Sequence, residues 1–122
     1  MSETELINKN EYGGYYTYIG RGSPFGNQYV LIKHGGEYTR RESIEKYRDW
    51  FNDKIDNEPE FRQAVEELRG KTLGCSCVPE ACHGHVILSY LEGEPYTEAV
   101  DKYIEYGGQI EDYLSGKTLF DY

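Results

Sequence analysis

Three cysteines and two histidines are crowded into eleven consecutive residues, and this cluster constrains the fold more than any other feature. One residue separates Cys75 from Cys77, four separate Cys77 from Cys82, and His83 and His85 complete the pattern C-x-C-x4-C-H-x-H. Sulfur and imidazole nitrogen are the ligands that zinc prefers, and three cysteines with one histidine form a common tetrahedral set. The pattern therefore predicts a zinc site around which the chain folds back on itself.

The cluster has more potential ligands than a tetrahedral ion needs. His83 can pair with Cys82 in a loop, and His85 can do so if a helix has begun, because residues i and i+3 share a helix face. Two other interpretations stay open. Cys82 and His83 are candidate catalytic residues if Cys82 is a nucleophilic or redox thiol at a helix N-terminus. Alternatively, the thiols are small buried hydrophobic groups.

A glycine-rich loop at residues 20–27 (GRGSPFGN) is the second candidate site. Backbone N–H groups and a guanidinium in such a loop can bind an anion. The loop matches neither the phosphate-binding P-loop nor the dinucleotide-binding fingerprint. The candidate ligand-binding residues are Gly20, Arg21, Gly22, Ser23 and Asn27. The alternative is a surface turn in which Arg21 is solvated or pairs with an acid such as Glu11 or Asp49.

Periodicity and turn residues predict an α/β fold, a small sheet with flanking helices and an acidic helical C-terminal tail. Strands are expected at Tyr15–Ile19, Tyr29–Lys33 and Lys71–Cys75. Helices are expected from a Thr39–Glu42 capping box to about Asn57, from Pro59 to Gly70, and over Cys82–Leu91, Tyr96–Tyr106 and Gln109–Leu114. The arginines of the first helix, Arg40, Arg41 and Arg48, are interpreted as surface residues, and the alternative is that they face the glycine loop and hold an anion.

The glycine loop and the thiol cluster each follow a predicted strand, which ends at Ile19 or at Cys75. Ligands in open α/β sheets collect at the carboxyl ends of the strands. We therefore expect Arg21 and Cys82 to border one cleft.

These segments together resemble the family of domains of unknown function called DUF4326, small α/β proteins from phages, bacteria and some eukaryotes. The resemblance covers residues 15–91 and rests on ordered motifs: Tyr18-Ile19-Gly20-Arg21, Gly26-Asn27, Tyr47-Arg48-Asp49-Trp50, Leu68-Arg69-Gly70-Lys71, Cys75-Ser76-Cys77-Val78-Pro79 and Cys82-His83-Gly84-His85. The chain departs from the family pattern at Gln28, where proline is usual, at Ser76, where tryptophan is usual, and at His85, where aspartate is usual. The resemblance supports the site but implies no reaction.

Charge divides the chain into two predicted parts. Residues 1–91 form the domain that resembles the family and carry a net charge of −3, whereas residues 92–122 form an acidic, tyrosine-rich helical extension of net charge −6. A total of −9 makes direct DNA binding unexpected, because backbone contacts need a basic face. Neither a membrane span nor a signal peptide is expected. Clustered, odd-numbered cysteines favour a cytoplasmic location, which is the host cytoplasm if the protein is phage-encoded.

The function expected from the sequence is a zinc-binding domain that recognises a nucleotide, nucleobase or other small anionic ligand, with or without acting on it. The alternative is a non-enzymatic interaction or anti-defence protein of phage type. In that alternative the zinc is structural, and the acidic tail binds a protein partner.

Overall fold

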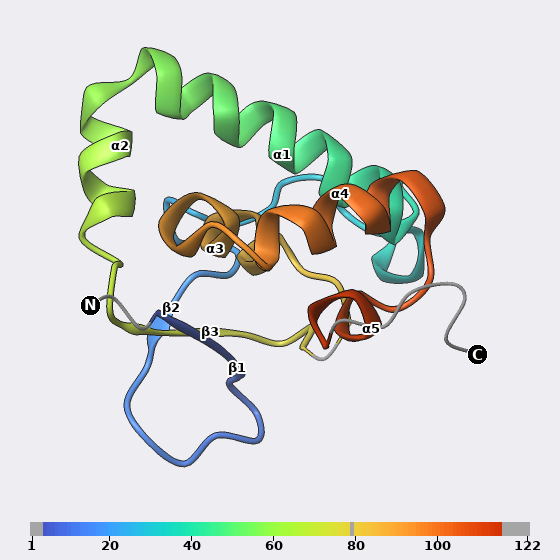
Figure 1. The fold of residues 1–122 in the computed structure, drawn as a ribbon, viewed down its shortest axis with the longest axis horizontal. Coiled ribbons are helices and arrows are strands. Elements are labelled where there is room, and N and C mark those ends of the chain that lie inside the picture. Colours follow the sequence, from blue (N-terminus) through green and yellow to red (C-terminus); the bar gives the residue numbers. More distant parts are fainter. Residues whose placement is uncertain (1–3, 79, 116–122) are drawn as a thin grey trace.

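The computed structural model describes residues 4–78 and 80–115, and its centre is a three-stranded parallel sheet in the order β1–β3–β2 (Figure 1). The strands are β1 (Glu5–Asn8), β2 (Thr17–Tyr18) and β3 (Thr72–Cys75). A 3-10 turn, η1 (Ile32–His34), precedes the α-helices, which are α1 (Arg40–Asn57), α2 (Pro59–Glu66), α3 (His83–Glu92), α4 (Tyr96–Tyr106) and α5 (Ile110–Leu114). The fold is α/β, as the sequence predicted.

Strand β3 is the centre of the sheet and is buried from Leu73 onward. Leu6 of β1 pairs with Leu73 on one side, and Tyr18 of β2 pairs with Gly74 on the other. All three strands run in the same direction, so they end at one edge of the sheet. The segments that follow β2 and β3 are the glycine loop and the thiol cluster, which therefore start side by side.

One strand prediction fails, and one strand of the sheet was missed. Strand β1 was not expected, because the segment Glu5–Asn8 is half polar and only four residues long. The strand expected at Tyr29–Lys33 is absent: Leu31 makes one isolated bridge to Tyr38, and η1 follows. Ile32 is 60% exposed, so its apolar character reflects no buried strand face. The strand expected at Tyr15–Ile19 is reduced to β2.

Helix α1 begins at the predicted capping box. The Glu42 N–H donates to Thr39 Oγ1, and the Thr39 N–H donates to Glu42 Oε1, at 3.2 and 3.0 Å. This reciprocal pair satisfies donors that a helix start otherwise leaves free. The helix buries one face, whose core members are Ile44, Tyr47, Phe51 and Ile55. Helix α2 has Pro59 in its first turn and ends at Glu66, and a turn continues to Gly70.

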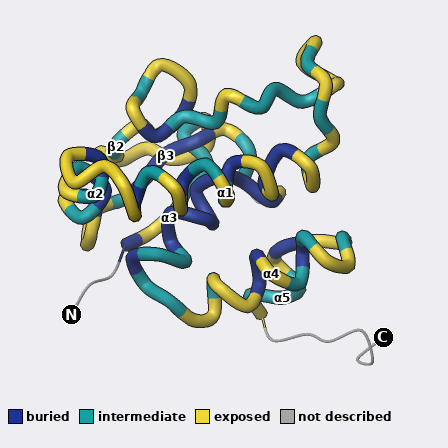
Figure 2. Tube along the Cα trace, turned by 90° about the horizontal axis from the view of Figure 1, so that it is seen from above, coloured by how far each residue is buried: buried dark blue, intermediate teal, exposed yellow. Residues whose placement is uncertain are grey.

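Helix α3 lies between the sheet and α1, as the middle of three layers (Figures 1 and 2). Each residue from His83 to Leu88 is buried. Gly84 permits the close approach to the sheet, because a Cβ there would lie 2.6 Å from Leu6 Cδ1 and 3.1 Å from Ile19 Cδ1. The cysteine–histidine segment therefore begins a helix that is part of the core.

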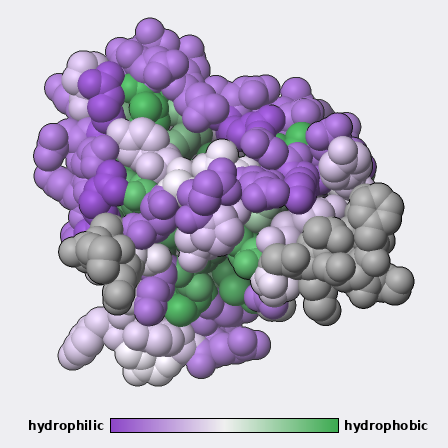
Figure 3. All heavy atoms as spheres, viewed as in Figure 1, coloured by the Kyte–Doolittle hydropathy of each residue, from purple (hydrophilic) through white to green (hydrophobic). Residues whose placement is uncertain are grey.

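Helices α4 and α5 pack on the domain through a short apolar stripe. Its buried members are Ala99, Val100, Tyr103 and Ile110. The Arg41 guanidinium also ties α1 to the end of α4, donating to the carbonyl oxygens of Ile104 and Glu105 at 2.8 and 2.9 Å. The face of the molecule shown in Figure 3 is largely hydrophilic. The predicted tail reaches residue 122, and its last seven residues lie outside the described part. Among the described helices, none combines the length and apolarity needed to cross a membrane.

Candidate functional site

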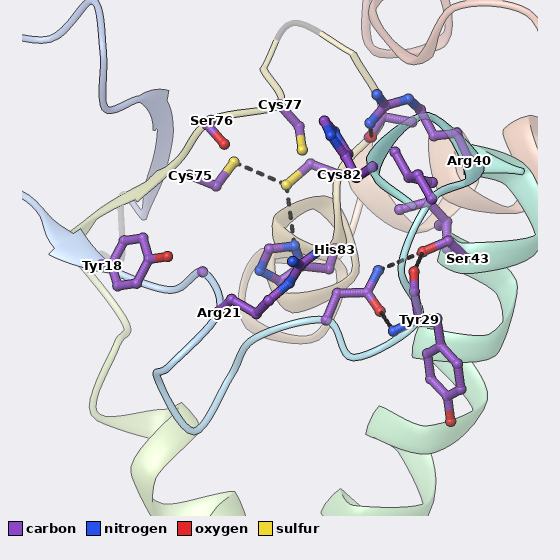
Figure 4. Close-up of a pocket in the computed structure, with 16 residues that line it drawn as sticks. Tyr18, Arg21, Tyr29, Arg40, Ser43, Cys75, Ser76, Cys77, Cys82 and His83 are labelled. Carbon is purple, nitrogen blue, oxygen red and sulfur yellow. Dashed lines mark hydrogen bonds between the residues drawn. The ribbon is translucent and has the colours of Figure 1, made fainter. Parts of the chain in front are cut away.

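A cavity of about 360 Å³ opens where β2 and β3 end, and both predicted sites line it (Figure 4). Gly20 and Arg21 come from the glycine loop, and Cys75, Cys77 and Cys82 form the sulfur-rich wall. The other described lining residues are Tyr18, Asn27, Tyr29, Leu31, His34, Arg40, Ser43, Ile44, Ser76, Ala81 and His83. We call this cavity the thiol pocket. The expectation that Arg21 and Cys82 border one cleft is met.

The glycine loop folds tightly on itself. Ser23 Oγ donates to the Gly20 carbonyl at 2.7 Å. Gly26 lies against the start of the loop, because a Cβ there would stand 2.7 Å from the Gly20 carbonyl oxygen and 3.0 Å from Arg21 Cα. Buried Tyr47 of α1 donates its hydroxyl to the Phe25 carbonyl at 2.7 Å. These contacts fix the loop against α1 and leave the Arg21 side chain exposed at the pocket.

Asn27 positions the pocket wall. Its Nδ2 donates to Ser43 Oγ at 2.8 Å, and its Oδ1 accepts from the Tyr29 N–H at 2.9 Å. Ser43 Oγ in turn donates to the Tyr29 carbonyl at 2.6 Å. This closed set of bonds holds Tyr29 at the pocket. Of the predicted ligand-binding residues, Gly20, Arg21 and Asn27 line the pocket, whereas Gly22 and Ser23 do not.

The sulfur atoms of Cys75 and Cys82 lie 2.9 Å apart and are almost inaccessible to solvent, whereas Cys77 is half-buried. Cys75 ends β3, and Cys82 is the N-cap of α3, so rigid elements hold both. Cys77 sits in the connecting loop, which is tied to β1 by the bond from Asn8 Nδ2 to the Val78 carbonyl at 2.8 Å.

His83 turns one ring nitrogen toward this cluster. Its Nε2 lies 2.8 Å from the Ile19 carbonyl oxygen, which can only accept, so Nε2 carries the proton. Nδ1 then presents a lone pair, and it lies 3.4 Å from Cys82 Sγ. Burial lowers the pKa of His83, which favours this neutral form. The lone pair on Nδ1 can therefore accept a hydrogen bond from the Cys82 thiol or serve as a metal ligand.

His85 has a different position from the other four predicted metal ligands. Its Nδ1 accepts the Cys82 N–H at 3.0 Å and so caps the start of α3. Its ring is buried and does not line the pocket. The aspartate usual at this position would have an oxygen available for the same bond, which gives the departure at His85 a physical reason. Burial lowers the pKa of His85 to about 4.

Arg40 lines the pocket, which agrees with the alternative interpretation of the α1 arginines and not with the favoured one of a solvated surface residue. Its guanidinium donates to the Ala81 carbonyl at 3.0 Å and pairs with Glu80 at 2.8 Å. Hydrogen bonds from the Cys75 and Cys82 thiols, and then Arg40, hold the pKa of Cys77 well below its usual range. Hydrogen bonding with Cys75 and Cys77, followed by burial, raises the pKa of Cys82.

The donor set is the one that zinc prefers, although Cys75 and Cys82 hold their sulfurs closer together than two ligands of one zinc ion. Two thiolates on a tetrahedral ion lie about 3.8 Å apart, so Cys75 and Cys82 would have to separate by about 0.9 Å. Among the described residues, no group of three or more cysteine, histidine, aspartate or glutamate side chains has the geometry to hold a metal ion as it stands. The hydrogen bond from His83 to Ile19 is typical of the support that metal-bound histidines receive.

The arrangement is that of a small α/β domain with a ligand-sized pocket at the carboxyl edge of its sheet. The chain belongs to the DUF4326 family, described as a domain of unknown function, whose model matches residues 7–93. It is also 38% identical over 69 residues to an uncharacterized 12.4 kDa protein in the nrdA–td intergenic region of Enterobacteria phage T4. That match covers 57% of this chain and 60% of the phage protein. No solved structure matches the chain.

Proposed function

We propose that the protein binds a small anionic ligand of the nucleotide class in the thiol pocket, beside a zinc ion held by Cys75, Cys77, Cys82 and His83. The observation that carries the proposal is the charge of the pocket. The chain has 22 acidic residues and a net charge of −9, yet no aspartate or glutamate is among the described residues that line the pocket. Two arginines line it. A guanidinium in a pocket whose described lining has no carboxylate favours an anion.

Arg21 supplies the anion-binding group. Its side chain makes no ion pair or hydrogen bond with any described residue, whereas Arg40 is already engaged by Glu80 and Ala81. An unpaired guanidinium offers a planar fork that matches a phosphate or carboxylate. Neither Glu11 nor Asp49 pairs with Arg21 in the described structure, so the alternative of a structural ion pair receives no support.

The remaining pocket walls support a ligand with a flat ring. Tyr18 and Tyr29 line the pocket together with His34, and the cavity volume falls within the range of about 300–1,000 Å³ typical of small-molecule sites. Tyr29 is held by Asn27 and Ser43 through its backbone, and its ring packs edge-on against Tyr38 at 5.6 Å. Tyr18, which is 43% exposed, is therefore the aromatic ring more open to a ligand. Aromatic rings of this kind stack on nucleobases.

Zinc is the second part of the proposal. The three sulfurs and His83 Nδ1 supply a four-ligand set, which is typical of a structural zinc site. Zinc would draw thiolates from this cluster and fix the wall of the pocket opposite the glycine loop. We place the protein in the cytoplasm of a phage host, on the basis of its three free cysteines and its similarity to a phage protein. A protein partner for the acidic tail stays a prediction.

Calorimetric titration of the full chain with nucleoside monophosphates, the matching nucleosides and inorganic phosphate tests the ligand. Two matched variants each remove one positive charge. Arg21→Gln removes it at the pocket. Lys71→Gln removes it just before β3, at the end of the strand away from the pocket. Losing a charged hydrogen bond costs about 1.5–3 kcal/mol, so Arg21→Gln should weaken monophosphate binding roughly 10- to 100-fold. Lys71→Gln should leave it unchanged. Equal affinities for the two variants, or no binding of any phosphate by the wild-type protein, would contradict the proposal.

A further inference from the structure

The sulfur atoms of Cys75 and Cys82 lie 2.9 Å apart, in contact with each other. We propose that these two cysteines form a reversible disulfide within the thiol pocket. A disulfide requires about 2.05 Å between the sulfurs, so closing the bond needs a movement of less than about 1 Å. The inference does not depend on zinc or on the anionic ligand.

The backbone positions make this pair specific. Cys75 is the last residue of β3 and Cys82 is the N-cap of α3, and the sheet and α3 are packed against each other. Cys77 belongs to the loop between them and is the most exposed of the three thiols. A Cys75–Cys82 bond would bridge the ends of that loop and leave Cys77 as a free thiol.

Cys75 and Cys82 are only 2% and 1% exposed, and both line the pocket, so an oxidant would reach them from the pocket side. The oxidant we infer is a low-molecular-weight disulfide such as oxidised glutathione. One protein thiolate attacks it and releases one small thiol, and the second protein thiolate attacks the mixed disulfide and releases the other. Two protein thiols and one small disulfide thus become one protein disulfide and two small thiols. The two released protons go to solvent or to the small thiolates.

The consequence is a change in the pocket wall that small thiols can reverse. Oxidation would take two of the three sulfurs out of use as metal ligands or nucleophiles and would shorten the distance between β3 and α3. The redox state of the surrounding thiol pool would then decide which chemistry the pocket offers.

The test uses the full-length, metal-stripped protein equilibrated in glutathione buffers of increasing oxidised fraction. Free thiols are alkylated, and the chain is cut after glutamate, which separates Cys75 and Cys77 from Cys82 at Glu80. We expect a non-reduced peptide pair joined by Cys75 and Cys82, with the alkyl label on Cys77 by fragmentation. The Cys75→Ser variant lacks one partner of the bond. At the glutathione ratio that half-oxidises the wild-type protein, it should show Cys82 fully alkylated.

The wild-type peptide map is decisive even if a variant fails to fold. Complete alkylation of all three cysteines at every glutathione ratio would overturn the proposal. A bond that joins Cys77 to either neighbour in place of the Cys75–Cys82 bond would also overturn it.

Discussion

The hydroxyl of Tyr47 is expected to be a main anchor of the glycine loop, and Tyr47→Phe removes that hydroxyl alone. The side chain is fully buried, and its hydroxyl donates to the Phe25 carbonyl at 2.7 Å. Phe25 is itself only 7% exposed, so water cannot readily replace the lost donor. Leaving a buried carbonyl without its partner costs about 1–3 kcal/mol. Burial raises the pKa of Tyr47 well above its usual value, so the hydroxyl remains a donor across the accessible pH range.

Urea denaturation followed by the fluorescence of Trp50 measures this cost. Trp50 is the single tryptophan, and its ring lies 5.3 Å from that of Tyr47, so it reports on the same part of the core. With a urea dependence of about 1–3 kcal/mol per molar, the midpoint should fall by roughly 1 M.

Tyr90→Phe is the matched control for this substitution. The Tyr90 hydroxyl donates at 2.8 Å to Glu66, a half-exposed carboxylate that water can solvate instead. We expect the control to lose less than about 1 kcal/mol. A Tyr47→Phe variant as stable as Tyr90→Phe would refute the reasoning, because the Phe25 carbonyl would then not depend on Tyr47.

The other predictions concern pH and the shape of the loop. The pKa of about 4 for buried His85, against an ordinary 6.5, means that its contribution to stability is complete above pH 6.5 and is lost as pH falls toward 4. In a pH series of denaturation curves, metal-stripped protein should therefore lose up to about 3 kcal/mol of unfolding free energy over that range. The His85→Asn variant keeps an acceptor for the Cys82 N–H but has no group that titrates there, so it should lose less. Gly26→Ala should destabilise the protein by about 1–3 kcal/mol because its Cβ would meet backbone atoms. Gly13→Ala, where the added Cβ meets nothing, should be neutral by the same assay, and equal effects would contradict the close packing of the loop.

Local signals made most of the helices predictable. The capping box at Thr39 and Glu42 and the proline at position 59 act within one turn, and the structure confirms both helix starts. Strands depend on distant partners, which explains the errors. Glu5–Asn8 becomes a strand only because β3 offers it a neighbour, and the apolar run at Tyr29–Lys33 has no strand to join.

The pocket was predictable where chain order alone decides its position. Residues that follow parallel strands must meet at one edge, which brought Arg21 and Cys82 together. The role of Arg40 depends on the rotation of α1 relative to β3, and the sequence does not encode that rotation locally. The different roles of His83 and His85 were also not predictable from the sequence. They depend on how α3 is rotated and shifted against Ile19, which accepts the hydrogen bond from His83.

Metal content tests the central claim of one shared thiol–imidazole site most directly. The full chain, purified under reducing conditions with zinc and then dialysed, should retain about one zinc per chain by elemental analysis, and bound metal should protect the three thiols from a chromogenic disulfide reagent. Serine at Cys75, Cys77 or Cys82 should abolish retention, whereas His85→Asn should preserve it, because the Nδ1 of His85 caps α3 and its ring lies outside the pocket. Folded wild-type protein that retains no zinc and whose three thiols all react freely would contradict the account.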